Sequence, residues 1–183
     1  MLEEFFIDLL KDTGRNNINS LICWLKDETD FFSAPASTKY HGSYKGGLLR
    51  HSYNVLKRLD KIAIPEYNFD SVVIVSLLHD ICKANFYSVA QRNVKNDITG
   101  KWEKQPFYGV DEILPFGGHG SKSVYLIMKH GVALTDEEAI AINCHMGGWD
   151  VSTYHNPSKA YETYHLPLYL HIADLQATYL DDK

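Results

Sequence analysis

The chain has 183 residues, of which 45% are apolar and 22% are charged. These values are ordinary for one globular domain and exclude a largely disordered chain. The formal net charge of −5 excludes a general nucleic-acid coat and a basic membrane-surface binder, although it allows a local basic patch.

The sequence also predicts a compartment. Its first residues lack the basic start, the apolar run and the cleavage site of a signal peptide. The most apolar stretch, residues 72–78, is far too short to cross a bilayer. Cys23, Cys82 and Cys144 are odd in number and show no CxxC spacing, which argues against a disulfide framework and a cysteine zinc site. We therefore expect a cytoplasmic protein without a membrane partner, in which Cys82 and Cys144 are small core residues.

The first half of the chain predicts helices around one irregular segment. Apolar residues have helical spacing in residues 2–11, 18–25, 48–59 and 69–83. The last of these stretches is apolar nearly all round, which predicts a central helix. Residues 32–47 contain one proline and three glycines and are expected to form a loop that carries function.

The second half combines a hairpin with further helices. Residues 86–108 carry spaced apolar and aromatic residues around Asp97-Ile98-Thr99-Gly100, which predicts a β-hairpin. Helices are expected at 118–131, 135–145 and 166–180, the second of them opened by a Thr-x-x-Glu capping box. Residues 146–157 are expected to be a loop. The prediction is a mostly α single domain over residues 1–183, with six or seven helices and a hairpin insertion at about 86–108.

Histidine and aspartate residues recur on the predicted helices and at their ends. In chain order they are His51, the adjacent His79 and Asp80, His119, His145 and Asp174. Asp174 lies among apolar residues, where a carboxylate has to be paired, protonated or metal-bound. Imidazole and carboxylate ligands without thiolate suit an open catalytic site for a divalent transition ion better than a closed structural zinc site.

This order of residues resembles the HD superfamily of metal-dependent phosphohydrolases. The matching sequence segments are Gly46-Gly47-Leu48-Leu49-Arg50-His51-Ser52, Leu77-Leu78-His79-Asp80-Ile81-Cys82-Lys83, Gly118-His119-Gly120 and Ala173-Asp174. The similarity runs from about Tyr40 to Leu180, and the wording is most similar to the HD domain of bacterial 3′–5′ exoribonucleases. The resemblance implies an HD-domain helical bundle with a small β-hairpin insertion.

The resemblance also implies a ligand set. The four core ligands of one metal ion would be His51, His79, Asp80 and Asp174. His119 and His145 would match the additional histidines of binuclear members, in which Asp80 would bridge two ions. The cofactor would be one or two divalent transition ions per chain, and Mn²⁺, Fe²⁺, Co²⁺, Ni²⁺ and Zn²⁺ all suit such ligands.

Several residues are candidates for catalysis and substrate binding. By the resemblance, Lys83 would face substrate phosphate, which makes Asp80 and Lys83 the predicted catalytic residues. The alternative for Lys83 is a cation that stabilises the dipole at a helix C-terminus. The other substrate-binding candidates are His41, Lys45, Arg50 and Trp149, each of which also suits a solvated loop or a core position.

These features predict a metal-dependent phosphohydrolase or phosphodiesterase that hydrolyses a nucleotide or a short single-stranded nucleic acid by metal-activated water. The alternative is a nucleotidase, or a deoxynucleoside triphosphate triphosphohydrolase, with one metal ion. A binding module that keeps the ligand without turnover is a further possibility. The basic, aromatic hairpin is typical of a surface that stacks single strands, and also of one that packs on helices. The oligomeric state stays open.

Overall fold

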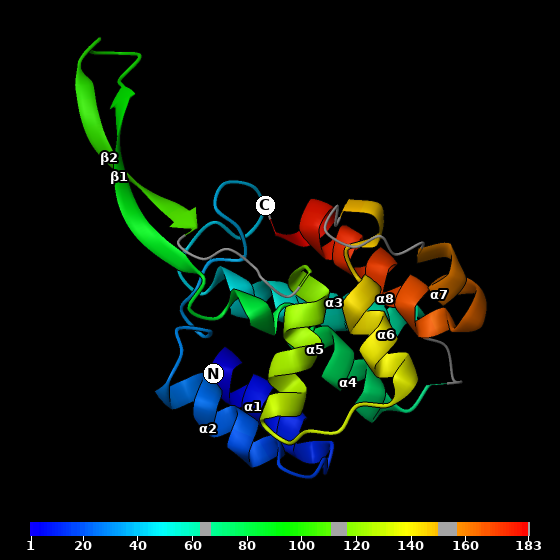
Figure 1. Cartoon of the computed structure of the whole chain (residues 1–183). Coiled ribbons are helices and arrows are strands. Elements are labelled where there is room, and N and C mark those ends of the chain that lie inside the picture. Colours follow the sequence, from blue (N-terminus) through cyan, green and yellow to red (C-terminus); the bar gives the residue numbers. More distant parts are fainter. Residues whose placement is uncertain (63–66, 111–116, 150–156, 183) are drawn as a thin grey trace.

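The chain forms a body of packed helices from which one β-hairpin projects (Figure 1). This computed structural model describes residues 1–62, 67–110, 117–149 and 157–182. The helices are α1 (Leu2–Asp12), α2 (Ile18–Asp27), α3 (Gly47–Ile62), α4 (Phe69–Leu78), α5 (His119–Lys129), α6 (Asp136–Cys144), α7 (Pro157–Thr163) and α8 (His165–Gln176). The strands are β1 (Tyr87–Lys95) and β2 (Trp102–Val110). The prediction of a mostly α chain with one hairpin is therefore confirmed, but the described residues form eight α-helices and not the expected six or seven.

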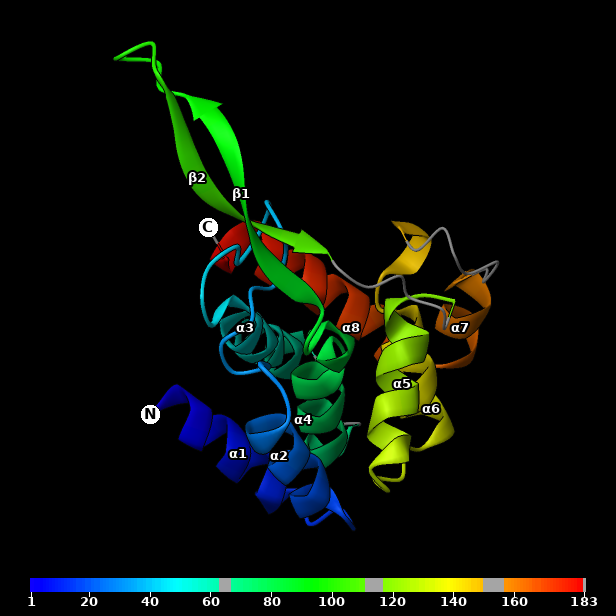
Figure 2. The same cartoon turned by 60° about the vertical axis from the view of Figure 1, so that its left-hand side comes forward.

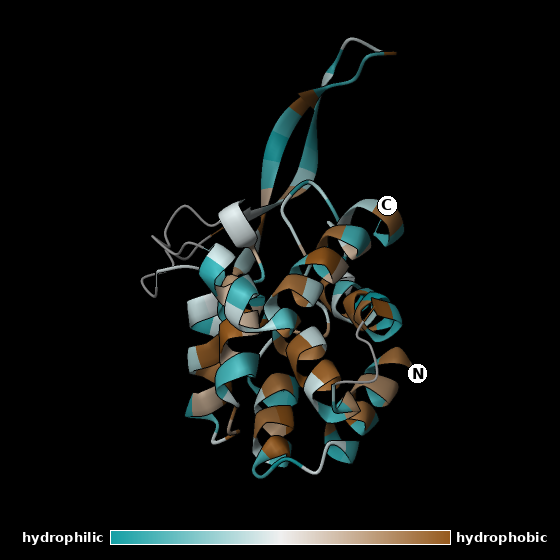
Figure 3. Cartoon of the chain, turned by 90° about the vertical axis from the view of Figure 1, so that its right-hand side faces the viewer, coloured by the Kyte–Doolittle hydropathy of each residue, from teal (hydrophilic) through white to brown (hydrophobic). Residues whose placement is uncertain are grey.

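Helix α4 is the centre of the core, as its all-round apolar sequence predicts. It buries every residue from Val72 to Leu78 and packs against α1, α3 and α6. Its first turn is capped by Asn68, whose side chain accepts a hydrogen bond from the backbone N–H of Asp70. Figure 3 shows the apolar residues gathered on the helices, whereas the hairpin is largely hydrophilic. Burial of α4 therefore provides much of the hydrophobic stabilisation of the body.

The prediction of one helix over residues 69–83 is wrong at its end. Helix α4 ends at Leu78, and Asp80 leaves the helical conformation with φ −107° and ψ 18°. A 3₁₀ turn, Ile81–Lys83, follows, because the Lys83 N–H bonds to the Asp80 carbonyl three residues back, at 2.9 Å. His79 keeps helical dihedral angles, and after the change of direction at Asp80 the Asp80 carboxylate lies 3.4 Å from His79 Nε2.

The hairpin is a two-stranded antiparallel sheet whose register runs from Tyr87 opposite Val110 to Lys95 opposite Trp102. It projects well beyond the helices in both views (Figures 1 and 2). At its base the Tyr87 hydroxyl donates to the Ala36 carbonyl at 3.1 Å, which ties the hairpin to the loop before α3. The predicted hairpin at 86–108 is confirmed.

The prediction of a loop over residues 146–157 is only partly right. Gly147–Trp149 forms a 3₁₀ turn, α7 begins at Pro157, and residues 150–156 lie outside the described part of the chain. Proline at a first helical position loses no hydrogen bond, so Pro157 was an overlooked signal for a helix start. Beyond α8 the chain continues in a π-helical turn, Ala177–Asp181. Within the described residues, no helix is both long and apolar enough to span a bilayer.

Candidate metal centre

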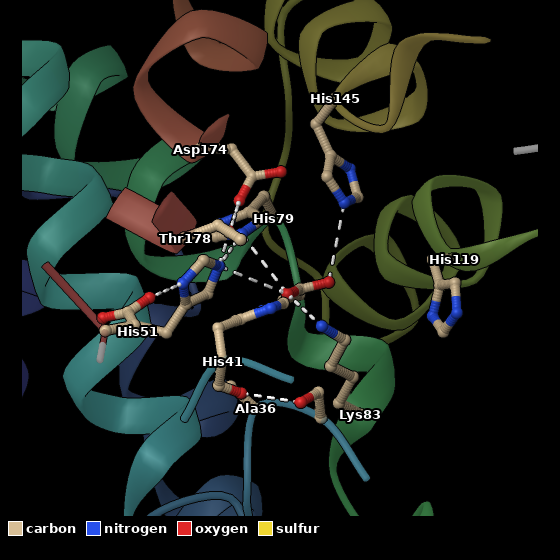
Figure 4. A network of polar contacts seen from close by, with 12 residues as sticks. Ala36, His41, His51, His79, Lys83, His119, His145, Asp174 and Thr178 are labelled. Atoms are coloured by element: carbon tan, nitrogen blue, oxygen red, sulfur yellow. Dashed lines mark hydrogen bonds and ion pairs between the residues drawn. The ribbon is translucent and has the colours of Figure 1, made fainter. Parts of the chain in front are cut away.

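Five predicted ligands meet at one place between the helices. His51 lies on α3, His79 and Asp80 follow the end of α4, His145 follows α6, and Asp174 lies on α8. Figure 4 shows His51, His79 and Asp174 together, with His145 pointing to the same centre and His119 to one side, on α5. Helices α3 and α6 both pack against α8, which brings ligands distant in sequence into contact.

His51, His79 and Asp174 form the first group of donor atoms. His51 Nε2 lies 3.2 Å from Asp174 Oδ1 and 3.3 Å from His79 Nε2. All three donor atoms lie within 4.8 Å of one another. Both imidazoles are fully buried, and the carboxylate is 13% exposed. Three donors at these separations can hold one divalent ion.

Asp80 presents its two oxygens to different histidines. Oδ2 lies 3.6 Å from His51 Nε2 and 3.4 Å from His79 Nε2. Oδ1 lies 3.5 Å from His145 Nε2, and both of these atoms are buried without a hydrogen-bond partner. A buried polar atom without a partner costs free energy unless something else satisfies it. The arrangement fits an ion between Asp80 and His145, and a carboxylate shared by two ions.

The second ring nitrogen of each histidine fixes the direction of its ring. His79 Nδ1 donates to the Ser76 carbonyl at 2.8 Å, and His145 Nδ1 donates to the Ile142 carbonyl at 2.7 Å. Nδ1 of His51 lies 2.6 Å from Asp182 Oδ2. Each of these contacts at Nδ1 turns the Nε2 atom of its ring toward the centre, which is the orientation found in metal-binding histidines.

Asp182 is a site residue that the sequence analysis missed. Its carboxylate is buried, accepts from Asn54 Nδ2 at 2.6 Å through Oδ1, and contacts His51 through Oδ2. Its neighbour Asp181 points outward and pairs with Arg58. Nothing in the local sequence separates the two aspartates: Asp181 is the last residue of the π-helical turn, and Asp182 follows it.

His171 is a second residue whose place the sequence did not indicate. Its Nδ1 donates to the His145 carbonyl at 2.6 Å, so it supports the end of α6. The ring also packs against Gly147, whose φ is 55° and where a Cβ atom would come within 2.7 Å of His171. A glycine at position 147 is thus required by close packing and by its backbone conformation.

The electrostatics keep the carboxylates ionised. Burial alone would raise the pKa of Asp80, but Lys83 and His79 hold it well below its usual range. Lys83 Nζ lies 2.7 Å from Asp80 Oδ2, and the contact raises the pKa of the buried lysine against the effect of burial. Burial would also lower the pKa of His51, but hydrogen bonds to Asp174 and Asp182 raise it to about 9. The centre therefore combines ionised Asp80 and Lys83 side chains with His79, whose pKa is lowered by burial.

The centre opens to a cavity of about 560 Å³. Among its lining residues are Asp80, Lys83, His145 and Asp174, together with His41 and Trp149. The His41 ring lies 4.9 Å from the His51 ring, and burial lowers the pKa of His41 to about 4. Trp149 is 71% exposed at the cavity rim.

Two predicted substrate contacts, Lys45 and Arg50, stand apart from this cavity. Their side chains are exposed and do not line it. His41 and Trp149 therefore have the positions expected of substrate-binding residues, whereas Lys45 and Arg50 have those of solvated surface residues.

His119 belongs to a different group of donors from His145. Its Nδ1 lies 3.3 Å from Cys82 Sγ, and Asp80 completes a triad whose donor atoms lie within 4.8 Å of one another. Cys82 is fully buried, as expected, but its thiol makes a polar contact and is not only a core hydrophobe. Burial raises the pKa of this thiol to about 12.

Comparisons of the chain with protein-family models, with curated proteins and with solved structures found no match.

Proposed function

We propose that the chain is a metal-dependent phosphoric ester hydrolase. The observation that carries the proposal is the pair of buried, partnerless atoms, Asp80 Oδ1 and His145 Nε2, which face each other beside the His51–His79–Asp174 group. The motif resemblance to HD phosphohydrolases supports the same chemistry. A cytoplasmic location stays part of the proposal, since Cys23, Cys82 and Cys144 are all free thiols.

The residues fit one or two divalent transition ions. His51, His79 and Asp174 would hold the first ion, and Asp80 would share it with a second ion held by His145. Nitrogen and carboxylate donors suit Mn²⁺, Fe²⁺, Co²⁺, Ni²⁺ and Zn²⁺. A bound ion supplies a Lewis acid for a phosphoryl oxygen and lowers the pKa of a water molecule toward about 7.

Lys83 is the residue best placed to meet a phosphate. Its ammonium group lines the cavity and contacts Asp80 Oδ2 with one of its three hydrogen-bond donors. The remaining donors can bind a phosphoryl oxygen and stabilise the charge that develops during hydrolysis. His41, which the lowered pKa keeps neutral at pH 7, can orient the substrate across the same cavity without adding charge.

A second cavity favours a substrate longer than a mononucleotide. It measures about 350 Å³ and lies between the loop before α3 and the base of the hairpin. Lys39 and Arg92 line it, no carboxylate among the described residues does, and the Arg92 guanidinium lies 5.6 Å from the Phe107 ring centroid. Tyr40, the residue after Lys39, lines the metal cavity. A short single-stranded nucleic acid could place one phosphate at each cavity, with its base near the aromatic rings.

The test is metal content followed by hydrolysis of a substrate panel with Mn²⁺. The panel contains bis-p-nitrophenyl phosphate, nucleoside mono- and triphosphates, and short single-stranded RNA and DNA. Asp80→Ala should lose metal and turnover while its circular dichroism is kept, and Asp60→Asn, an exposed aspartate on α3, should behave as wild type. Full turnover in Asp80→Ala would refute the proposal.

The panel also separates the alternatives. About two ions per chain with diester cleavage support the phosphodiesterase, whereas one ion with mononucleotide turnover supports the nucleotidase or triphosphohydrolase. A metal-loaded protein that is inert to the panel, yet is stabilised against heat by a nucleotide, would be a binding module.

A further inference from the structure

The turn after α4 brings a thiol into the neighbourhood of the predicted metal centre. Cys82 is the middle residue of the 3₁₀ turn Ile81–Lys83, and its backbone N–H donates to Ser123 Oγ on α5 at 3.2 Å. The turn is thereby attached to the helix that begins with His119. Thiol and imidazole meet through this contact, although 37 positions separate them in the chain.

The position of His119 is also fixed by close backbone packing. Gly118 has φ 141°, a conformation that side-chain-bearing residues rarely adopt. A Cβ atom on Gly120 would come within 2.4 Å of the Asn143 carbonyl oxygen, so the start of α5 lies directly against the end of α6. The two glycines therefore set the direction from which His119 reaches Cys82.

We propose that Asp80, Cys82 and His119 form a thiolate-containing metal site that takes a thiophilic divalent ion, Zn²⁺ in preference to Mn²⁺. The proposal rests on the proposed metal centre, with which it shares Asp80, but it does not require hydrolysis. The three donor atoms lie within 4.8 Å of one another. Cys82 and Asp80 are buried, and His119 is half-buried.

The donor separation and the donor types support this assignment. A sulfur and a nitrogen bound to one tetrahedral zinc ion lie about 3.5 Å apart, given bonds of about 2.3 and 2.0 Å. Cys82 Sγ and His119 Nδ1 are 3.3 Å apart. Thiolate binds Zn²⁺ and Co²⁺ far better than Mn²⁺, whereas carboxylate and imidazole discriminate less. The group around His51 contains no sulfur donor, so the two groups should differ in ion preference.

The first experiment uses Co²⁺ as the probe, because thiolate ligation gives a near-ultraviolet charge-transfer band that nitrogen and oxygen ligands lack. The Cys23→Ser/Cys144→Ser double variant keeps Cys82 as its one cysteine and leaves the buried turn untouched. We expect the full band in wild type and in this double variant. Absence of the band from a cobalt-loaded double variant would overturn the proposal.

The converse variant is Cys82→Ser, with folding checked by circular dichroism. It should lose the cobalt band and bind Zn²⁺ at least about tenfold more weakly in chelator competition, since even a lost outer-shell partner costs about 10–100-fold. Its Mn²⁺ affinity should change less than about twofold. An unchanged band or an unchanged preference for Zn²⁺ over Mn²⁺ in the folded variant would overturn the site.

The readouts also separate this inference from the proposed function. Hydrolysis with Mn²⁺ but no thiolate band in the cobalt protein would refute only the thiolate site. A thiolate band that depends on Cys82, in a protein that hydrolyses nothing in the substrate panel, would support the site and refute the hydrolase.

Discussion

Helix α4 and strand β1 are nearly equal in length, but they differ in how they are held. Helix α4 buries seven of its ten residues. Strands β1 and β2 contain no fully buried residue, and their exposed side chains include Val89 and Trp102, both at 69%. The helix is held by packing on several sides, whereas the hairpin depends on its cross-strand pairs and on contacts at its base.

The comparison explains where a metal centre can be built. Ligands have to be held to within a fraction of an ångström, and the end of α4, unlike the hairpin, is packed among other helices. The hairpin can present charge and rings to a flexible ligand, but it cannot fix them to that tolerance. We therefore expect substitutions at the centre to have large effects and substitutions of the hairpin to have small ones.

The largest difference should appear in turnover. Asp174→Ala removes a buried ligand, so we expect loss of bound metal and a fall in kcat/KM of at least about 10³-fold. Glu103→Ala, which removes an exposed carboxylate from the hairpin, should change kcat/KM by less than about twofold. Both are measured with the best substrate of the panel and by metal analysis. Equal effects of the two substitutions would contradict the expected difference between the centre and the hairpin.

Stability should differ between the same two regions. Leu78→Ala leaves a cavity at a fully buried position of α4, which typically costs about 3–5 kcal/mol of unfolding free energy. Val94→Ala, at a half-buried position of β1, should cost less than about 1 kcal/mol. Denaturant unfolding of the metal-free protein measures both. A cost at Val94 similar to that at Leu78 would mean that the hairpin is packed against a partner in solution.

A smaller effect is expected from the residue that orients His51. Asp182→Asn keeps the shape of the side chain but weakens the hydrogen bond at 2.6 Å to His51 Nδ1, and it should lower metal affinity about 10–100-fold. Asp181→Asn is the matched control, because that aspartate pairs with Arg58 at the surface and should change metal affinity less than about twofold. Chelator competition measures both. Similar losses in the two variants would show that Asp182 acts through general charge and not through His51.

The residues around the centre show how much of it the sequence could predict. Five predicted ligands lie in recognisable sequence segments or at helix ends and converge in the structure: His51, His79, Asp80, His145 and Asp174. Their local sequence segments and their order in the chain marked them without any spatial information, even on α8, which has no side-chain N-cap. The capping box at Thr135 is present as predicted and correctly marks the start of the helix that ends beside His145.

Three features of the site that the sequence did not predict depend on geometry beyond the local pattern. The end of α4 at Leu78 depends on a change to 3₁₀ hydrogen bonding, for which a continuous apolar run gives no signal. The contact of Cys82 with His119 joins residues 37 positions apart. Similarly, Asp182 contacts His51 directly after a π-helical turn, Ala177–Asp181. Helix periodicity carries no information on any of these three features.

The smallest predicted effect tests whether the hairpin takes part in substrate binding. Arg92 lines the cavity at the hairpin base, and Lys101 lies in the exposed turn at the far end. Because an exposed charge pair contributes at most about 1 kcal/mol, Arg92→Ala should raise the KM for a short single-stranded oligonucleotide by no more than about fivefold, with kcat unchanged. Lys101→Ala should leave this KM unchanged.

The KM of the same two variants is also measured with bis-p-nitrophenyl phosphate. This small diester can occupy the metal cavity without reaching the hairpin, so neither substitution should change its KM. A rise in KM for both substrates in Arg92→Ala would mean that the arginine supports the loop carrying His41 and not the substrate. A rise in KM for the oligonucleotide alone would show that the base of the hairpin binds the second phosphate. The two regions would then differ in their role: the helices hold the reacting phosphate, and the hairpin holds the rest of the substrate.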